Sequence, residues 1–141
     1  MPSGVLILAE LLDGAVSPVT HELVGAAQRL GAGPVSAMLI GSPVEGAASG
    51  VTGVEKTYVV DDPALREYQG DAYLPSAERI AKEVDPAVVL FGQTMMGRDL
   101  APRLAQRLGT AVAMDCMALS MNGDKLVAER PCYGEIGRAH V

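Results

Sequence analysis

Short runs of apolar residues, each bounded by glycine, proline or charged residues, recur along the first two thirds of the chain. They span Gly4 to Glu10, Val35 to Ile40, Tyr58 to Val60 and Ala87 to Phe91. Continuous apolar runs of this length are typical of strands in a parallel sheet, because helices cover both faces of such a sheet. The pattern therefore predicts four buried strands.

Between these runs the apolar residues recur at every third or fourth position, which predicts helices packed on the sheet. The first helix is predicted over Pro18 to Leu30, with Ser17 as its N-cap and Gly31 as its stop. Two more helices are predicted over Asp71 to Val84 and Asp99 to Leu108. Repeated strand, helix, strand units of this kind indicate an α/β fold.

The last third of the chain has a different pattern. Strands are predicted over Ala111 to Ser120 and Lys125 to Tyr133, because they flank Asn122-Gly123, the strongest short-range signal for a β-hairpin. A short helix between Val44 and Val51, weakened by its Ala and Gly content, completes the cover of the sheet. Together these elements predict a three-layer α/β fold that is Rossmann-like and adenine-nucleotide-hydrolase-like. Its mostly parallel sheet has crossover helices and ends in an antiparallel hairpin, within one domain of residues 1–134.

The composition excludes several classes of function. The 141 residues include 11 Lys and Arg against 17 Asp and Glu, a net charge of −6 without any basic block, so we expect no nucleic-acid partner. The apolar run from Val5 to Ala9 is too short for a membrane span or a signal sequence, so we expect a cytoplasmic protein with no membrane insertion. Cys116 and Cys132 fit neither a disulfide framework nor a metal cluster, so we expect two small buried thiols in a reducing compartment.

No combination of residues predicts catalysis or metal binding. His21 lies in the first predicted helix, and the only other histidine is His140 near the end of the chain. Neither a metal pair nor a catalytic triad can be assembled from these residues. We therefore expect no catalytic residue and no metal ligand, with His21 facing the solvent.

One junction between a strand and a helix is a candidate for binding an anion. The segment Gly92 to Asp99 follows a predicted strand, and backbone N–H groups at such a junction favour phosphate. Its two glycines have the spacing of a P-loop, but Arg98 stands where lysine belongs and Asp99 where the magnesium-binding Ser or Thr belongs. The candidate nucleotide-binding residues are Gly92, Gln93, Thr94, Gly97 and Arg98.

A purely structural interpretation of the same segment stays open. Its two glycines would permit a tight turn, and Asp99 would cap the following helix. A carboxylate at that position would satisfy the free N–H groups itself and would repel a phosphate. Met95 and Met96 are predicted to lie in the loop, where flexible side chains serve either a partner surface or the core. Arg98 is expected to face the solvent.

Four stretches resemble, in this order, the amino-terminal domain of electron transfer flavoprotein alpha subunits. They are Val-Leu-Ile-Leu-Ala-Glu at 5 to 10, Ser-Pro-Val-Thr at 17 to 20, the stretch from Val89 through Gly92-Gln-Thr-Met-Met-Gly-Arg-Asp to Leu104-Ala105, and Arg130-Pro-Cys-Tyr-Gly134. The resemblance covers nearly the whole chain before Glu135.

The resemblance implies a fragment of an alpha subunit that pairs with a beta subunit and serves as a scaffold of the heterodimer. In this family FAD is bound mainly by a carboxyl-terminal domain of the alpha subunit, which this chain lacks, so no FAD ligand is expected here. The whole protein is implied to carry electrons from flavin dehydrogenases, such as those of acyl-CoA, to a membrane quinone reductase in bacteria. The alternative is a free-standing adenine-nucleotide-binding module that uses the loop from Gly92 to Asp99.

Residues Glu135 to Val141 depart from the family pattern, in which Gly134 leads into more small residues and a further strand. A G followed by a common short-read sequencing adapter, translated in this frame, encodes the same seven residues. We therefore expect residues 135–141 to be a non-native tail. The strand from Lys125 to Tyr133 would then be left with an unpaired edge.

Overall fold

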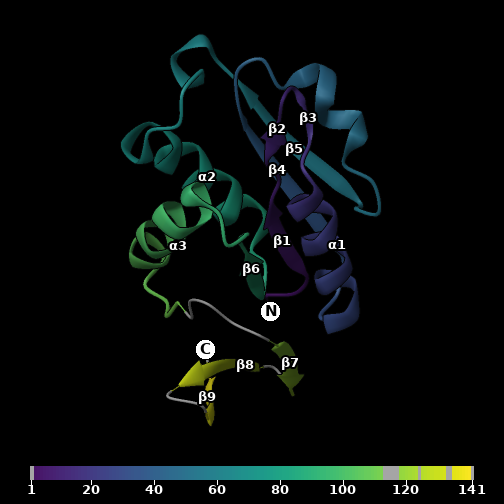
Figure 1. Ribbon diagram of the computed structural model, residues 1–141, viewed down its shortest axis with the longest axis vertical. Coiled ribbons are helices and arrows are strands. Elements are labelled where there is room, and N and C mark those ends of the chain that lie inside the picture. The colour runs from purple at the N-terminus through teal and green to yellow at the C-terminus, as the bar shows by residue number, and fades with distance from the viewer. Residues whose placement is uncertain (1, 113–117, 124, 133–134, 141) are drawn as a thin grey trace.

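A parallel sheet of four strands forms the centre of the computed structural model, which describes residues 2–112, 118–123, 125–132 and 135–140 (Figure 1). The order across the sheet is β5 (Lys56–Asp61), β4 (Val35–Gly41), β1 (Val5–Leu8) and β6 (Val88–Leu90). All neighbouring strands of this sheet run parallel. The prediction of a mostly parallel sheet is therefore confirmed.

Helices cover both faces of this sheet, as Figure 1 shows. On one face lie α1 (Pro18–Leu30) and the short 3-10 helix η1 (Glu45–Gly50), packed on the core cluster that contains Val5 and Ile7. On the other face lie α2 (Gly70–Val84) and α3 (Met95–Leu108), packed on the cluster that contains Leu6 and Leu8, with the short helix η2 (Pro63–Leu65) ahead of α2. The fold is thus a three-layer α/β arrangement, as predicted.

The ends of α1 agree with the sequence prediction. Pro18 occupies the first turn, and Gly31 ends the helix with a left-handed φ of 63°. Ser17 precedes the helix, but its side chain makes no capping hydrogen bond. Its hydroxyl instead lies 3.1 Å from the hydroxyl of Thr20, whose N–H donates to the Ser17 carbonyl.

A small hairpin that was not predicted joins β1 to α1. It consists of β2 (Leu11–Leu12) and β3 (Ala15–Val16), which pair antiparallel. Asp13 and Gly14 both have positive φ values, 53° and 82°, as a two-residue type I′ turn requires. The Asp-Gly pair is a recognised hairpin signal, so the sequence did contain the information.

The prediction that residues 58–60 are buried is wrong, because β5 is an edge strand. None of its side chains is fully buried: Thr57, Tyr58 and Val60 are partly buried, and Val59 is 36% exposed. Only β4 pairs with β5 among the described residues. The apolar run identified the strand correctly but did not show that it lies at the border of the sheet.

The second sheet has three strands, β7 (Ala118–Asn122), β8 (Lys125–Cys132) and β9 (Glu135–His140). β7 and β8 form the predicted antiparallel hairpin, and β9 pairs antiparallel with the other side of β8. The expected unpaired edge on β8 is therefore wrong for this structure. Residues 113–117 and 133, within the predicted strands, and Cys116 lie outside the described residues, as does the side chain of Cys132.

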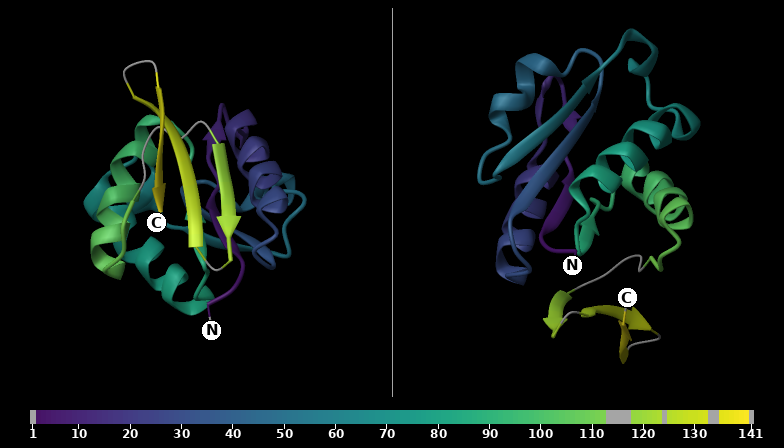
Figure 2. Two further views of the ribbon diagram at one scale, coloured as in Figure 1. Left: turned by 90° about the horizontal axis from the view of Figure 1, so that it is seen from below. Right: turned by 180° about the vertical axis from the view of Figure 1, so that it is seen from behind.

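The small sheet lies at the end of the molecule where the parallel strands begin (Figure 2). Leu119, Met121 and Leu126 of its hairpin pack against the core cluster on the α1 side. Within the described part of the chain, no helix has the length and apolar character needed to cross a bilayer.

Candidate functional site

The carboxyl ends of β1 and β6 lie side by side at the centre of the candidate site. The chain continues from β1 toward α1 and from β6 toward α3, on opposite faces of the sheet (Figure 1). In doubly wound folds, ligands bind in the crevice at such a switch point. The loop that the sequence singled out, Gly92 to Asp99, lies at this position.

Both glycines of this loop permit close contacts within the protein. A Cβ atom on Gly97 would overlap the carbonyl oxygen of Gly92, so the start of α3 rests directly on the backbone of the loop. A Cβ atom on Gly92 would lie 2.8 Å from the Val19 Cγ2 atom of α1. Packing of α1, the loop and α3 against one another therefore explains the two glycines without any ligand.

Thr94 is the N-cap of α3. Its hydroxyl oxygen accepts a hydrogen bond from the Gly97 N–H at 3.0 Å and donates one to Oε2 of Glu10 at 2.7 Å. The prediction that the helix starts at Asp99 and is capped by that residue is therefore wrong. Met95 and Met96, predicted in a loop, are the first residues of the helix.

The two methionines differ in their surroundings. Met95 is 87% exposed, whereas Met96 packs against the core cluster of α2 and α3. The sequence left a partner surface and the core as alternatives for both; the structure places Met96 against the core, and a partner surface at the exposed Met95 stays a prediction.

Glu10 brings a buried carboxyl group into the crevice. It follows β1 with 9% of its surface exposed, and its Oε2 atom would lie 3.4 Å from a Cβ on Gly92. Burial raises the pKa of this carboxyl, and the hydrogen bond from Thr94 lowers it in part. The Glu10 backbone is also fixed, since its N–H donates to the Thr20 hydroxyl and its carbonyl accepts from the Ser17 N–H.

The five candidate residues thus have different environments. Gly92 and Gly97 are buried, Thr94 is partly buried, and Gln93 and Arg98 are exposed, which confirms the expectation for Arg98. The N–H of Gly97 already has an acceptor in Thr94. Glu10, which the sequence analysis did not select, lies 84 positions from Thr94, and no local pattern connects the two.

Asp99 joins α3 to the segment before α2. Its Oδ2 accepts a hydrogen bond from the Tyr68 hydroxyl at 2.6 Å, and this bond lowers the pKa of Asp99. Its Oδ1 lies 3.3 Å from Nε of Arg103, which also pairs with Asp71 at 3.2 Å. Asp99 is therefore part of a polar network between helices, away from the backbone N–H groups at the start of α3.

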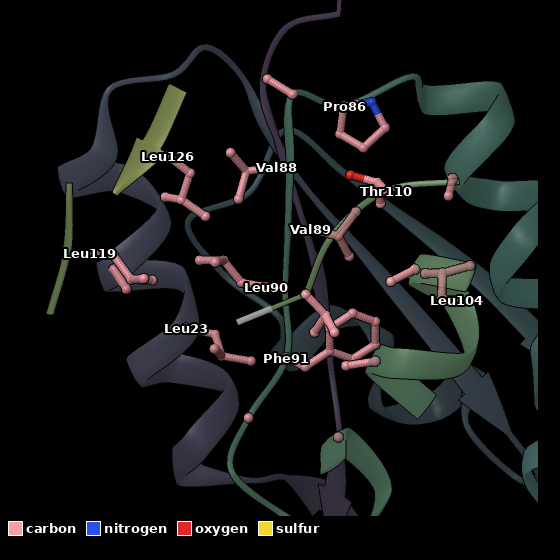
Figure 3. A pocket seen from close by; sticks show the side chains of 18 of the residues that line it. Leu23, Pro86, Val88, Val89, Leu90, Phe91, Leu104, Thr110, Leu119 and Leu126 are labelled. Carbon is pink, nitrogen blue, oxygen red and sulfur yellow. The ribbon is translucent and has the colours of Figure 1, made fainter. Parts of the chain in front are cut away.

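A groove with a volume of about 1010 Å³ runs along β6 (Figure 3). Its floor includes Val89 and Phe91, one wall includes Leu23 of α1, and the opposite wall includes Leu104 of α3. Leu119 and Leu126 of the hairpin also line it. Gly92, Gln93, Gly97 and Arg98 line it as well, so most of the candidate loop residues face this groove.

Two predictions concern metal binding and histidine. In the part of the chain that the structure describes, no three His, Cys, Asp or Glu residues are grouped so that they could hold a metal ion. His21 is exposed on α1, as expected.

Comparison with known proteins identifies related sequences. The family model "Electron transfer flavoprotein domain" matches residues 5–141. The electron transfer flavoprotein subunit alpha of Bacillus subtilis is 35% identical over 136 residues, which cover 94% of this chain and 42% of that protein. The corresponding subunit of Thermoanaerobacterium thermosaccharolyticum is 38% identical over 134 residues, covering 91% and 41%. The subunit LctC of a lactate dehydrogenase (NAD(+),ferredoxin) from Acetobacterium woodii is 36% identical, covering 93% and 33%. The chain therefore spans about two fifths or less of the length of these relatives.

Replacing Gly97 by alanine tests the packing interpretation of the loop. We expect Gly97→Ala to lower the free energy of unfolding by about 2 kcal/mol or more, because the added methyl group overlaps the Gly92 carbonyl. Gly25→Ala in α1 is the matched control, since its Cβ would meet only the end of the Arg29 side chain. That variant should gain up to about 1 kcal/mol from helix propensity. Urea denaturation of both variants measures the difference, and equal effects would contradict the close contact.

Glu10→Gln tests the buried carboxyl group. The folded pKa of Glu10 lies above its ordinary value of about 4.5, so the folded state holds the proton more tightly than the unfolded state. The stability of the wild-type protein should therefore fall as the pH rises from about 4.5 through the folded pKa, and then level off. Glutamine does not titrate but can still accept the hydrogen bond from Thr94.

We expect Glu10→Gln to be at least as stable as the wild type at pH 7 and to lose this relative advantage below about pH 4.5. Urea denaturation at several pH values measures this, with Glu22→Gln, at an exposed position of α1, as the control. A relative stability of Glu10→Gln that falls as the pH rises would contradict a carboxylate whose burial outweighs its hydrogen bond from Thr94.

Proposed function

The chain belongs to the electron transfer flavoprotein family, and from this premise we propose that it is the amino-terminal domain of an alpha-type subunit. In this proposal the domain is a scaffold that pairs with a beta subunit. FAD is bound by another part of the whole protein. The domain contributes shape and contacts rather than redox chemistry.

The occupation of the switch-point crevice by the protein's own side chains is the observation that carries this proposal. A nucleotide phosphate bound there would use the free N–H groups at the start of α3. The Gly97 N–H is already bonded to Thr94, and the carboxyl group of Glu10 lies in front of the loop. The described residues of the crevice therefore do not fit the phosphate groups of FAD or of an adenine nucleotide, which supports a scaffold role over a nucleotide-binding module.

The proposed role places this domain in a chain of electron carriers. The whole protein would accept electrons from flavin dehydrogenases, such as those of acyl-CoA, and pass them to a membrane quinone reductase, with this domain in the bacterial cytoplasm. The relatives have different printed names: two are electron transfer flavoprotein subunits, and one is a subunit of a lactate dehydrogenase. Similarity in this domain therefore does not identify the electron donor.

We also propose that residues 135–141 come from sequencing adapter rather than from the gene. The support is the correspondence of all seven residues with the translated adapter. Sequencing of independent genomic clones tests this, and the same seven codons in those clones would contradict it.

Ligand binding by the purified chain tests the proposed function. We expect no flavin absorbance after incubation with FAD and gel filtration, and no heat of binding from AMP or ATP in calorimetry, because Thr94 already bonds the Gly97 N–H and a buried carboxylate lies next to it. Co-expression with a beta subunit of the same family should give a complex at a 1:1 ratio. If the monomer binds one FAD per chain and forms no complex with the beta subunit, the scaffold proposal is overturned. Binding of AMP or ATP with micromolar affinity would favour the nucleotide-binding module.

A further inference from the structure

The β5 edge of the parallel sheet has little of the protection that free sheet edges usually have. Natural proteins shield such an edge with charged side chains, proline or bulges. Between Lys56 and Asp61, β5 has four uncharged residues, Thr57 to Val60, all of types that favour strands. None of the four is fully buried. The middle of β5 is therefore suited to pairing with another strand, and its charges stand only at its two ends.

The outer side of β5 has backbone groups with no strand beside them, since β4 is the only strand that pairs with β5 in the described ranges. The N–H of Asp62 donates to the Gly41 carbonyl of β4. Backbone groups of successive residues point to opposite sides of a strand, so every second residue of β5 faces β4 in this way. The N–H and C=O groups of the residues between them, Thr57, Val59 and Asp61, therefore point away from the sheet.

A second copy of β5 would pair with these groups in an antiparallel arrangement. A two-fold axis perpendicular to the sheet places the same edge of two copies side by side, and each residue then makes the same contact in both copies. The outward-facing residues of the two strands would lie opposite one another as hydrogen-bonded pairs. Two registers give the longest overlap of the strands, one with the axis at Val59 and one with the axis at Tyr58.

The charges at the ends of β5 distinguish the two registers. With the axis at Val59, Lys56 of each copy lies opposite Asp62 of the other. Opposite charges in this position stabilise a strand pair. In the other register Glu55 would lie opposite Asp61, and like charges directly opposite each other are destabilising. The edge is therefore complementary to itself in the register centred on Val59.

The uncharged residues of β5 agree with the same register. Tyr58 and Val60 both pack on the side of the sheet that α2 and α3 cover. With the axis at Val59, Tyr58 of each copy lies opposite Val60 of the other, and aromatic side chains pair favourably with β-branched ones. Val59 points to the opposite face with 36% of its surface exposed, and its counterpart in the second copy would cover part of it.

We propose that the β5 edge is an interface with a second copy of this chain. Two parallel sheets of four strands would join there, antiparallel, into one sheet of eight. β5 lies at the border of the sheet opposite β6, so the switch-point crevice and the groove stay outside the interface. The inference goes beyond the proposed function and does not rest on it. A complex with the beta subunit would then contain two copies of each chain.

Sedimentation velocity of the full chain over a range of concentrations tests for self-association. A single pair of strands buries less surface than a standard interface, so we expect a dimer that dissociates on dilution, with a dissociation constant on the order of 100 µM. A monomer at every concentration up to about ten times that value would overturn the proposal. Neither FAD nor a beta subunit enters the measurement, so this outcome would leave the scaffold proposal unaffected.

Two lysine substitutions locate the interface. Val59→Lys places two like charges opposite each other at the axis, so we expect it to weaken the dimer at least about tenfold. Met95→Lys is the matched control, since it adds the same charge at an apolar position that is 87% exposed on α3. That variant should dimerise like the wild type. Equal weakening by both substitutions, or a dimer that Val59→Lys leaves unchanged, would overturn the proposal.

A mixture of two charge variants tests the register, and it decides the proposal if Val59→Lys does not fold. In dimers of Lys56→Asp two aspartates would face each other, and in dimers of Asp62→Lys two lysines would, so we expect each variant alone to dimerise several-fold more weakly than the wild type. In a mixed dimer each aspartate lies opposite a lysine again. We therefore expect the mixture to dimerise within about threefold of the wild-type affinity. A mixture that associates no better than its components would overturn the proposed interface.

Discussion

The burial of β1 on both faces is the constraint on which the rest of the structure depends. All four residues of this strand are at most 1% exposed, and each buried aliphatic side chain contributes roughly 1.5–3 kcal/mol to stability. Since successive side chains point to opposite faces, one helix layer cannot cover them all. α1 must cover Val5 and Ile7, while α2 and α3 cover Leu6 and Leu8. The three layers, and the crevice where the chain leaves the sheet in two directions, follow from this requirement.

The sequence pattern predicted correctly those helices and strands whose ends depend on neighbouring residues in the chain. The first helix was predicted from Pro18 to Leu30 without error, because proline and glycine fix its ends by backbone geometry. The start of α3 was placed four residues too late, because Gly97 in a sequence suggests a loop. In the structure that glycine lies inside the helix, where it allows a tertiary contact with Gly92. Glu10 was missed for a related reason, since its partner Thr94 is distant in sequence and comes close only when β1 pairs with β6.

The switch-point crevice of this fold holds a threonine and a glutamate that bond to each other. A Rossmann-like switch point usually leaves backbone N–H groups free for a ligand. Here Thr94 donates to Glu10, which comes from a different element, and accepts from one N–H at the helix start, that of Gly97. The same contacts that would otherwise recognise a cofactor instead hold β1, the loop and α3 together. Such a use of the site suits a domain whose proposed task is to support assembly.

The cap at Thr94 has an evolutionary consequence. A return to phosphate binding could not be reached by one substitution, because removing the Glu10 carboxylate would leave the Gly97 N–H bonded to Thr94. Changing Thr94 alone would uncover that N–H beside a buried carboxylate and would also cost the helix its cap, about 1 kcal/mol. Neither substitution alone would therefore free the Gly97 N–H for a phosphate in a capped helix, whereas a double change at Glu10 and Thr94 would remove both side chains at once.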